Sequence, residues 1–263
     1  MHSWQNPNER IVTVITNRKN LNSPLILQMK AKGAEIWSNE MIRASYEGIK
    51  ARIPDAPYKD MRSMYGALKG ETVFICGAGP SLKDCPETLP GPVFAINRAI
   101  KQVKADYWCF CDMKAIRDSG DHPNAKTATW AFGSALHVFL PKTAGYLIEA
   151  CGNPMDYHVE SKRPLYWNGA TFSWVLHWAI KSGAKRIVII GCEFSLDGYF
   201  DGTAILPFSG QLNSLIVSET ARCRVDDMFG EDKSQWFDPS VEILDAAPNG
   251  YLPVPKVRLE DVL

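Results

Sequence analysis

The chain has 263 residues, enough for one large domain or for one domain with an extension. Basic and acidic residues number 29 each, so the formal net charge is zero, which argues against the strongly basic surface of a constitutive nucleic-acid binder. No apolar run approaches the ~20 residues that a membrane-spanning helix needs, and the N-terminus lacks the basic and apolar regions of a secretory signal. We therefore expect a soluble, cytoplasmic protein without a membrane span.

Residues 1–68 are predicted to form an N-terminal extension. The β-branched run Ile11–Thr16 predicts a short strand. The segment Ser23–Ile53 has mostly helical spacing, interrupted around Ala34–Trp37. Two prolines and a glycine then bracket a further short segment, and we assign residues 69–263 to a nucleotide-binding α/β domain.

This second part of the chain alternates predicted strands with predicted helices. Short apolar runs predict strands over Thr72–Cys76, Val93–Asn97, Tyr107–Cys111, Ala128–Phe132, Arg186–Ile190 and Val241–Leu244. Helices are expected over Ala144–Cys151, Gly169–Ser182 and Ser209–Met228. The alternation predicts an α/β fold with a doubly wound, mostly parallel, Rossmann-like sheet.

The most informative segment is a glycine loop directly after the strand Thr72–Cys76. The strand ends at two glycines, and a proline and a serine then open a predicted helix. Backbone N–H groups at such a point suit the phosphates of a nucleotide. The third glycine of a dinucleotide fingerprint is missing, and the Gly-Lys-Ser/Thr ending of a P-loop is absent. The loop predicts a phosphate or nucleotide site formed by Gly77, Ala78, Gly79, Pro80 and Ser81. A tight strand–helix turn without a ligand is the alternative.

Further polar residues stand where other predicted strands end or a helix begins. Ligands of parallel sheets bind beyond the carboxyl ends of the strands. Asn97 ends the second predicted strand of the domain and Arg98 follows it, and the two are expected to contact the nucleotide and its phosphate. Asn168, Gly169 and Thr171 open a buried helix and would let a ligand approach backbone N–H groups. Capping and surface roles are the alternatives for all five.

Carboxylates follow two of the strands. Asp112 follows Tyr107–Cys111, and Glu193, Asp197 and Asp201 lie in the loop after the strongest strand. Each is a candidate for a general base, a metal ligand or a sugar contact, and a cap or a solvated turn is the alternative. The cysteines and histidines show no metal-ligand spacing, so no metal site is assigned.

Taken together, these segments resemble a known superfamily. The stretch 74–82 (FICGAGPSL), followed by Leu89-Pro90 and Phe94–Asn97, resembles the opening of the bacterial lipooligosaccharide sialyltransferases. Residues 168–194 and 245–249 resemble their second nucleotide-contacting region and their last strand. The loop is also similar to that of the motility accessory factors of flagellin glycosylation and of the archaeal hydroxymethylpterin diphosphokinase-like family. The resemblance covers roughly residues 70–250.

The resemblance implies a glycosyltransferase that moves a sugar from a sugar nucleotide to a hydroxyl acceptor. The acceptor class stays open: a glycan, a protein, a small molecule or modified DNA. The glycine loop would hold the phosphates, and Asn97 and residues 168–171 would contact the nucleotide. The sialyltransferases use a late histidine as base, but residues 200–263 contain none. Asp112, Glu193 and Asp197 are therefore the catalytic candidates.

Two other functions are compatible with the same residues. One is a metal-dependent diphosphokinase of the hydroxymethylpterin type, which would use ATP and Mg²⁺. The other is a non-catalytic nucleotide-binding protein, which the missing histidine favours. The sequence names no firm cofactor beyond the sugar nucleotide as co-substrate, leaves room for Mg²⁺, and is compatible with a homo-oligomer.

Overall fold

A computed structural model describes the main sheet of the protein and much of the chain that packs against it. The described residues are 13–16, 27, 35–38, 58–111, 113–133, 145–148, 150–151, 165–166, 170–194, 198–202, 226, 228–229 and 238–263. The predicted site residues Asp112, Asn168, Gly169 and Asp197 lie outside them, as does most of the predicted helix Ser209–Met228.

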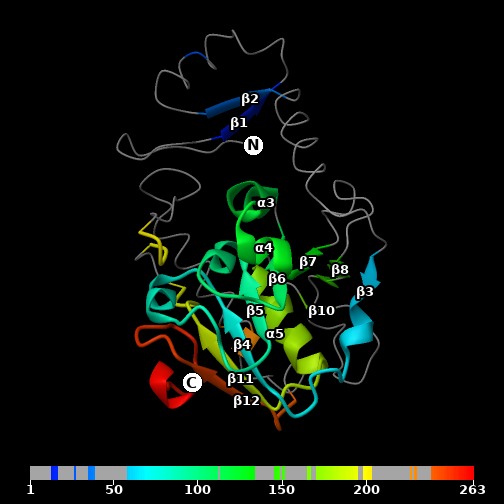
Figure 1. Cartoon of the computed structure of the whole chain (residues 1–263), viewed down its shortest axis with the longest axis vertical. Helices are drawn as coiled ribbons and strands as arrows, with labels where there is room; N and C mark the ends of the chain where they lie inside the picture. The colour runs from blue at the N-terminus through cyan, green and yellow to red at the C-terminus, as the bar shows by residue number, and fades with distance from the viewer. Residues whose placement is uncertain are drawn as a thin grey trace.

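An eight-stranded, all-parallel sheet forms the centre of the described structure (Figure 1). Its order is β12-β11-β4-β5-β6-β7-β8-β3. The strands are β3 (Lys59–Asp60), β4 (Thr72–Cys76), β5 (Val93–Ile96), β6 (Tyr107–Phe110), β7 (Thr129–Gly133), β8 (Gly145–Ile148), β11 (Arg186–Ile190) and β12 (Glu242–Asp245). Two further parallel pairs join β1 (Thr13–Thr16) to β2 (Glu35–Ser38) and β9 (Ala150–Cys151) to β10 (Leu165–Tyr166). The predicted α/β, Rossmann-like fold is confirmed.

Helices and 3₁₀ turns cover both faces of the sheet. The α-helices are α3 (Met113–Ser119), α4 (Pro123–Thr127) and α5 (Thr171–Lys181), and the 3₁₀ turns are η2 (Met61–Met64), η3 (Pro80–Asp84), η4 (Asn97–Lys101) and η8 (Leu259–Asp261). Alternate residues of the central strands β4, β5, β6, β7 and β11 enter two separate hydrophobic cores, as the two-residue period of a strand requires. In β4, Val73 and Ile75 pack on the α5 side, and Phe74 and Cys76 pack on the side of η3 and η4. A parallel sheet covered on both faces explains why these strands are apolar throughout.

Helix α5 is the central helix of one face. Nine of its eleven residues are buried, including Trp174 and Trp178, which are fully buried. The Trp178 indole N–H donates to the Met61 carbonyl at 3.1 Å, so the tryptophan is packed and hydrogen-bonded. Gly183, at φ +90°, follows the helix in the left-handed conformation that favours glycine after a helix end. This confirms the predicted helix, with slightly narrower bounds.

The order of the strands creates a switch point between β4 and β11. From β4 the chain adds β5, β6, β7 and β8 on one side, and it later places β11 and β12 on the other side. The loops after β4 and β11 therefore leave the same end of the sheet beside each other. In open parallel sheets this is the position where ligands bind.

The predicted helix Ala144–Cys151 is wrong, because this segment forms strands β8 and β9. Strand β8 pairs with β7 along its whole length, from Trp130 opposite Gly145 to Gly133 opposite Ile148. A Cβ at position 145 would overlap the Trp130 carbonyl, so the glycine permits close pairing. Sheet pairing overrides the local helical spacing here.

Residues before the expected boundary at position 68 belong to the same sheet and core. Strand β3 pairs with β8 at the edge of the sheet, and Met61, Met64 and Leu68 are buried in the core on the α5 side. Strand β1 lies within the predicted strand Ile11–Thr16, and β2 lies at the interruption of the predicted helical segment. No described helix has the length and apolar character needed to cross a membrane.

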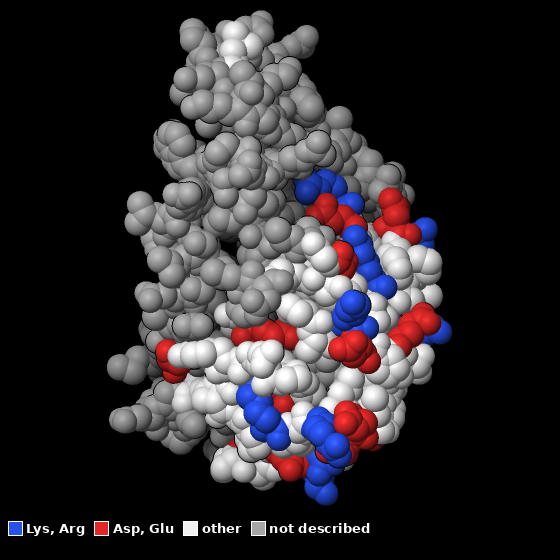
Figure 2. Space-filling view, turned by 90° about the vertical axis from the view of Figure 1, so that its left-hand side faces the viewer, with Lys and Arg blue, Asp and Glu red and all other residues white. Residues whose placement is uncertain are grey.

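The surface of the described part has mixed charge. On the face shown in Figure 2, basic and acidic side chains alternate without a large patch of one sign. Several form local ion pairs, such as Arg258 with Asp261 at 2.7 Å and Lys104 with Glu87 at 3.6 Å. This distribution agrees with the zero net charge of the chain.

Candidate functional site

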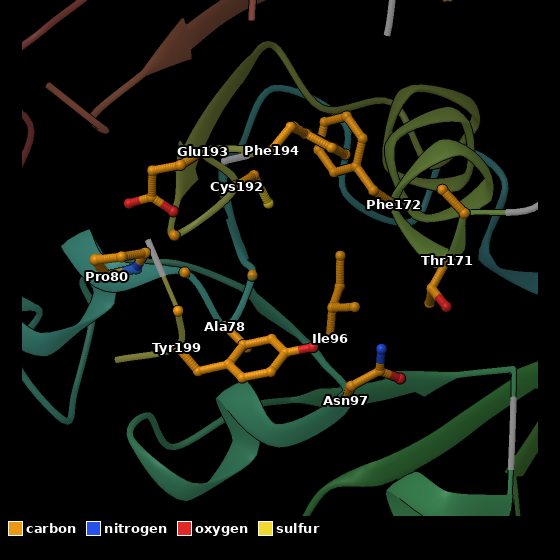
Figure 3. Close-up of a pocket in the computed structure, with 15 residues that line it drawn as sticks. Ala78, Pro80, Ile96, Asn97, Thr171, Phe172, Cys192, Glu193, Phe194 and Tyr199 are labelled. Atoms are coloured by element: carbon orange, nitrogen blue, oxygen red, sulfur yellow. The ribbon is translucent and has the colours of Figure 1, made fainter. Parts of the chain in front are cut away.

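A pocket of about 230 Å³ lies at the switch point, beyond the ends of β4, β5 and β11 and against the start of α5 (Figure 3). Loop, strand-end and helix-start residues line it: Gly77, Ala78, Gly79, Pro80, Ile96, Asn97, Ala170, Thr171, Phe172, Gly191, Cys192, Glu193, Phe194, Gly198 and Tyr199. Among these described lining residues the Glu193 carboxylate is the one formally charged group. The pocket therefore combines a negative group with apolar walls and neutral polar groups.

One wall of the pocket is a crossing of two loops, which follow β4 and β11. Gly77 N–H donates to the Ile190 carbonyl at 2.7 Å, and Gly79 N–H donates to the Gly191 carbonyl at 2.7 Å. In return, Gly191 N–H donates to the Ser81 hydroxyl oxygen at 3.1 Å. Two main-chain hydrogen bonds and one to the Ser81 side chain thus hold the two loops together.

The glycines at the crossing are needed because the two backbones approach closely. A Cβ at position 77 would overlap the Gly191 carbonyl oxygen and the Cys192 sulfur. Gly191 also has φ +68°, a conformation that favours glycine. The glycine pattern that suggested a phosphate loop therefore also has a packing role.

Glu193 is the central polar residue of the pocket. It is 5% exposed, and its Oε1 accepts a hydrogen bond of 2.7 Å from Ser81 N–H. Its Oε2 is buried and makes no hydrogen bond to any residue that the structure describes. A Cβ at position 79 would overlap Oε2, so Gly79 provides the space for the carboxylate. Figure 3 shows the Glu193 side chain extending toward the glycine loop and Pro80.

Asn97 is the main polar side chain of the opposite end of the pocket. Its Oδ1 is buried and has no hydrogen-bond partner within the described residues. Its φ is +51°, which asparagine tolerates better than most residues. The Trp108 indole N–H fixes this conformation by donating to the Asn97 carbonyl at 2.7 Å. In Figure 3 the hydroxyl end of Tyr199 points toward Asn97, and Thr171 lies on the same side.

Backbone strain is concentrated at the pocket. In the described segments, the two non-glycine residues with positive φ are Asn97 and Phe194, and both line it. Phe194 packs edge-on against Phe172, with ring centroids 5.3 Å apart, and forms an aromatic wall. Strained residues persist where the surrounding structure enforces them, and they cluster at functional sites.

Arg98 supports Tyr199 and does not line the pocket. Its guanidinium lies over the Tyr199 ring at 4.2 Å from the centroid, and it forms an ion pair of 3.3 Å with Asp201. Phe200 N–H donates to the Ala78 carbonyl at 3.1 Å, which ties this segment to the glycine loop. Arg98 thus positions an aromatic side chain of the pocket wall.

The turn after β12 also contacts Glu193, through the main chain of that residue. Tyr251 N–H donates to the Glu193 carbonyl at 3.2 Å. The turn that carries Tyr251 is anchored by Asp245, which is fully buried, accepts from Ala247 N–H at 2.8 Å and is paired with the Lys256 ammonium. Burial raises the pKa of Asp245 above its usual value. The Lys256 ammonium and the Ala247 N–H act in the opposite direction and offset only part of this rise. These contacts fix the backbone from which Glu193 projects.

Two titratable side chains of the described core, Cys192 and His177, are kept neutral by burial. Burial raises the pKa of the Cys192 thiol, which therefore stays neutral at the pocket wall. Burial, helped by the nearby Lys181 charge, lowers the pKa of His177 to about 3, so His177 is a neutral core residue. Within the described segments no group of three or more His, Cys, Asp or Glu side chains could hold a metal ion.

The structure brings most of the predicted site residues together. Seven line the pocket: Gly77, Ala78, Gly79, Pro80, Asn97, Thr171 and Glu193. Ser81 and Arg98 are adjacent but serve as partners of Glu193 and Tyr199. Sequence reasoning missed the apolar walls formed by Ile96, Phe172, Cys192 and Phe194, because an apolar residue at a strand end has the same pattern as a core residue.

Comparisons of the chain with protein-family models and with curated proteins return no match.

Proposed function

We propose that the protein is a glycosyltransferase-like enzyme that moves a sugar from a sugar nucleotide to a hydroxyl acceptor at this pocket. The observation that carries the proposal is the state of Glu193. One carboxylate oxygen is fixed by Ser81 N–H, and the other is buried at the pocket without a hydrogen bond to the described residues. A positioned carboxylate of this kind can serve as a general base for a hydroxyl group.

The proposed reaction is a displacement at the anomeric carbon of the donor. The acceptor oxygen forms a bond to that carbon while the bond from the carbon to the phosphate oxygen breaks. The electron pair of the broken bond leaves with the nucleotide, and the acceptor proton passes to Glu193. Of the three catalytic candidates, Glu193 is the one that the described structure contains and that lines the pocket.

Three further observations support a nucleotide as the ligand. The pocket occupies the switch point of a parallel sheet. Asn97 and Thr171 offer amide and hydroxyl groups, and Tyr199 offers a ring and a hydroxyl group, which suit a base or a ribose. The resemblance of residues 70–250 to the sialyltransferase and motility accessory superfamily points to the same class of ligand. The acceptor class, the cytoplasmic location and a homo-oligomer stay predictions.

Isothermal titration of the purified protein with CMP-, UDP- and GDP-sugars tests the donor. We expect one of the three to bind, and absence of binding to correctly folded protein would refute the proposal. Donor consumption, with and without Mg²⁺, then tests turnover. Binding without turnover would indicate a non-catalytic nucleotide-binding protein, and Mg²⁺-dependent AMP formation from ATP with a pterin would indicate a diphosphokinase.

The variant Glu193→Gln tests the role of the carboxylate. Glutamine keeps the shape of the side chain and an oxygen for Ser81 N–H, but it cannot take up the proton. We expect turnover to fall at least ~100-fold. Glu242→Gln is the matched control, because Glu242 is an exposed carboxylate in an ion pair with Arg186 and lies outside the pocket. Equal turnover of Glu193→Gln and wild type would exclude Glu193 as the base.

A further inference from the structure

The N–H groups of the glycine loop are largely used within the protein. Of the loop residues 77–81, Pro80 has no N–H group, and three of the other four donate to protein acceptors. Gly77 and Gly79 donate to carbonyls of the crossing loop, and Ser81 donates to Glu193. A phosphate-binding loop needs several convergent N–H groups that are open to the ligand. In this structure the loop does not present such a set.

The electrostatics at the loop also oppose a phosphate. The buried Glu193 carboxylate lies against Gly79, in the space that the missing Cβ leaves. Like charges repel strongly where little water separates them. The guanidinium of Arg98, the residue after Asn97, stacks on Tyr199 and pairs with Asp201. None of the described lining residues is positively charged to offset the carboxylate.

The Glu193 Oε2 atom, which has no hydrogen bond to the described residues, indicates which kind of ligand group fits the glycine-loop end of the pocket. A buried acceptor without a hydrogen bond is costly, and a ligand that donates an O–H or N–H group removes that cost. A neutral hydroxyl group meets both conditions, because it donates a hydrogen bond and carries no negative charge. The position of Oε2 beside the loop therefore favours a ligand group that donates a hydrogen bond and disfavours an anion.

We infer that the glycine-loop end of the pocket is a subsite for a neutral, hydroxyl-bearing part of the substrate and that Glu193 excludes phosphate from it. This rests on the proposed function in one respect, since the hydroxyl group at Glu193 is then that of the acceptor. The substrate is then bound the opposite way round from the expectation in the sequence analysis, in which the glycine loop holds the phosphates. The sugar nucleotide as a whole, base, ribose and phosphates, is left to the other end of the pocket, where Asn97 and Thr171 lie.

Binding of inorganic pyrophosphate, in Mg²⁺-free buffer, tests the exclusion directly and needs no sugar nucleotide. Three proteins are compared by calorimetry with wild type: Glu193→Gln, Glu193→Ala and the control Glu242→Gln. We expect no saturable binding at millimolar concentration for wild type and the control. Glu193→Gln should bind at least ~10-fold more tightly than wild type, because the negative charge is gone. Glu193→Ala should bind more tightly still, because Ser81 N–H is also released.

The outcomes separate this inference from the proposed function. Pyrophosphate binding by wild type that equals that of the variants would overturn the inference, as would variants that fold and gain no affinity. Should Glu193→Ala fail to fold, Glu193→Gln and wild type still give a decisive comparison. A wild-type protein that binds no sugar nucleotide would refute the proposed function and leave the pyrophosphate comparison intact.

Discussion

Glu193 and Ser81 are 112 positions apart in the chain, yet the Glu193 carboxylate accepts a hydrogen bond of 2.7 Å from Ser81 N–H. The bond joins the loops that follow β11 and β4, two neighbouring strands of the sheet. It fixes a carboxylate over a glycine loop that would otherwise suit an anion.

Gly79→Ala is expected to destabilise the protein, because the added Cβ would overlap Glu193 Oε2 and force the carboxylate to move. We expect a loss of about 1–3 kcal/mol in the free energy of unfolding, measured by denaturant titration. Gly133→Ala is the control, since its Cβ would meet the Cys111 sulfur at 3.3 Å and no backbone atom that closely.

A double-mutant cycle identifies the cause of the Gly79→Ala effect. If the overlap with Glu193 is responsible, Glu193→Ala should reduce the cost of Gly79→Ala by at least ~0.5 kcal/mol. Additive effects of the two substitutions would show that the Cβ acts through its other neighbour, the Gly191 carbonyl, and not through Glu193.

Replacements of Asn97 should separate backbone strain from side-chain function. At φ +51°, alanine is strained and glycine is not, so Asn97→Ala should be less stable than Asn97→Gly by about 1 kcal/mol. Both variants lose the amide, so both should bind the sugar nucleotide at least ~10-fold more weakly. Thermal unfolding and calorimetry measure the two effects. Full affinity in Asn97→Gly would show that the side chain does not contact the ligand.

Arg98→Met tests whether Arg98 positions Tyr199 or binds phosphate. The substitution removes the stacking on Tyr199 and the ion pair with Asp201. If Arg98 acts through Tyr199, affinity for a nucleoside and for its nucleotide should fall by a similar factor, on the order of threefold to tenfold. A selective loss of nucleotide affinity would instead indicate phosphate contact. Arg117→Met, at an exposed pair with Asp118, is the control.

His177 should make the protein less stable at acidic pH. The burial-lowered pKa of about 3 compares with 6.5 for the free side chain, so between these values the unfolded chain binds a proton that the folded protein does not. Stability therefore falls as the pH drops below 6.5, by up to ~1.4 kcal/mol per pH unit. Unfolding titrations of wild type and His177→Gln from pH 7 to pH 4 measure this. Equal pH slopes for the two proteins would contradict the assignment.

Six strands of the sheet, β4, β5, β6, β7, β11 and β12, could be predicted from the sequence because their apolar runs are continuous. Thr72–Cys76 and Arg186–Ile190 have the predicted bounds, since both strands are buried on both faces and both end at a glycine. The prediction of a helix over residues 144–151 is wrong because their apolar spacing is compatible with a helix. Pairing with β7 is what makes residues 145–148 a strand. Short edge strands such as β3 have too few residues to give a signal.

Part of the candidate site could also be predicted from the sequence. Asn97 and Glu193 were identifiable because polar residues after buried strands of a parallel sheet point to a ligand site. The pairing of Arg98 with Tyr199 and Asp201 was not identifiable, because Arg98 follows β5 whereas Tyr199 and Asp201 lie in the loop after β11, and only the folded sheet brings the two segments together. The apolar wall residues have no local signal that separates a pocket from a core.

By itself, the sequence determined the α/β architecture, the position of the glycine loop and the polar residues at the strand ends. These features depend on residue periodicity and on backbone conformation, which are local properties of a chain. Only the tertiary structure decided that the N–H of Ser81 serves Glu193, and that Gly79 gives space to a carboxylate. The reason is physical: hydrogen bonds and charge repulsion depend on distances of a few ångströms between atoms that the sequence places 112 residues apart.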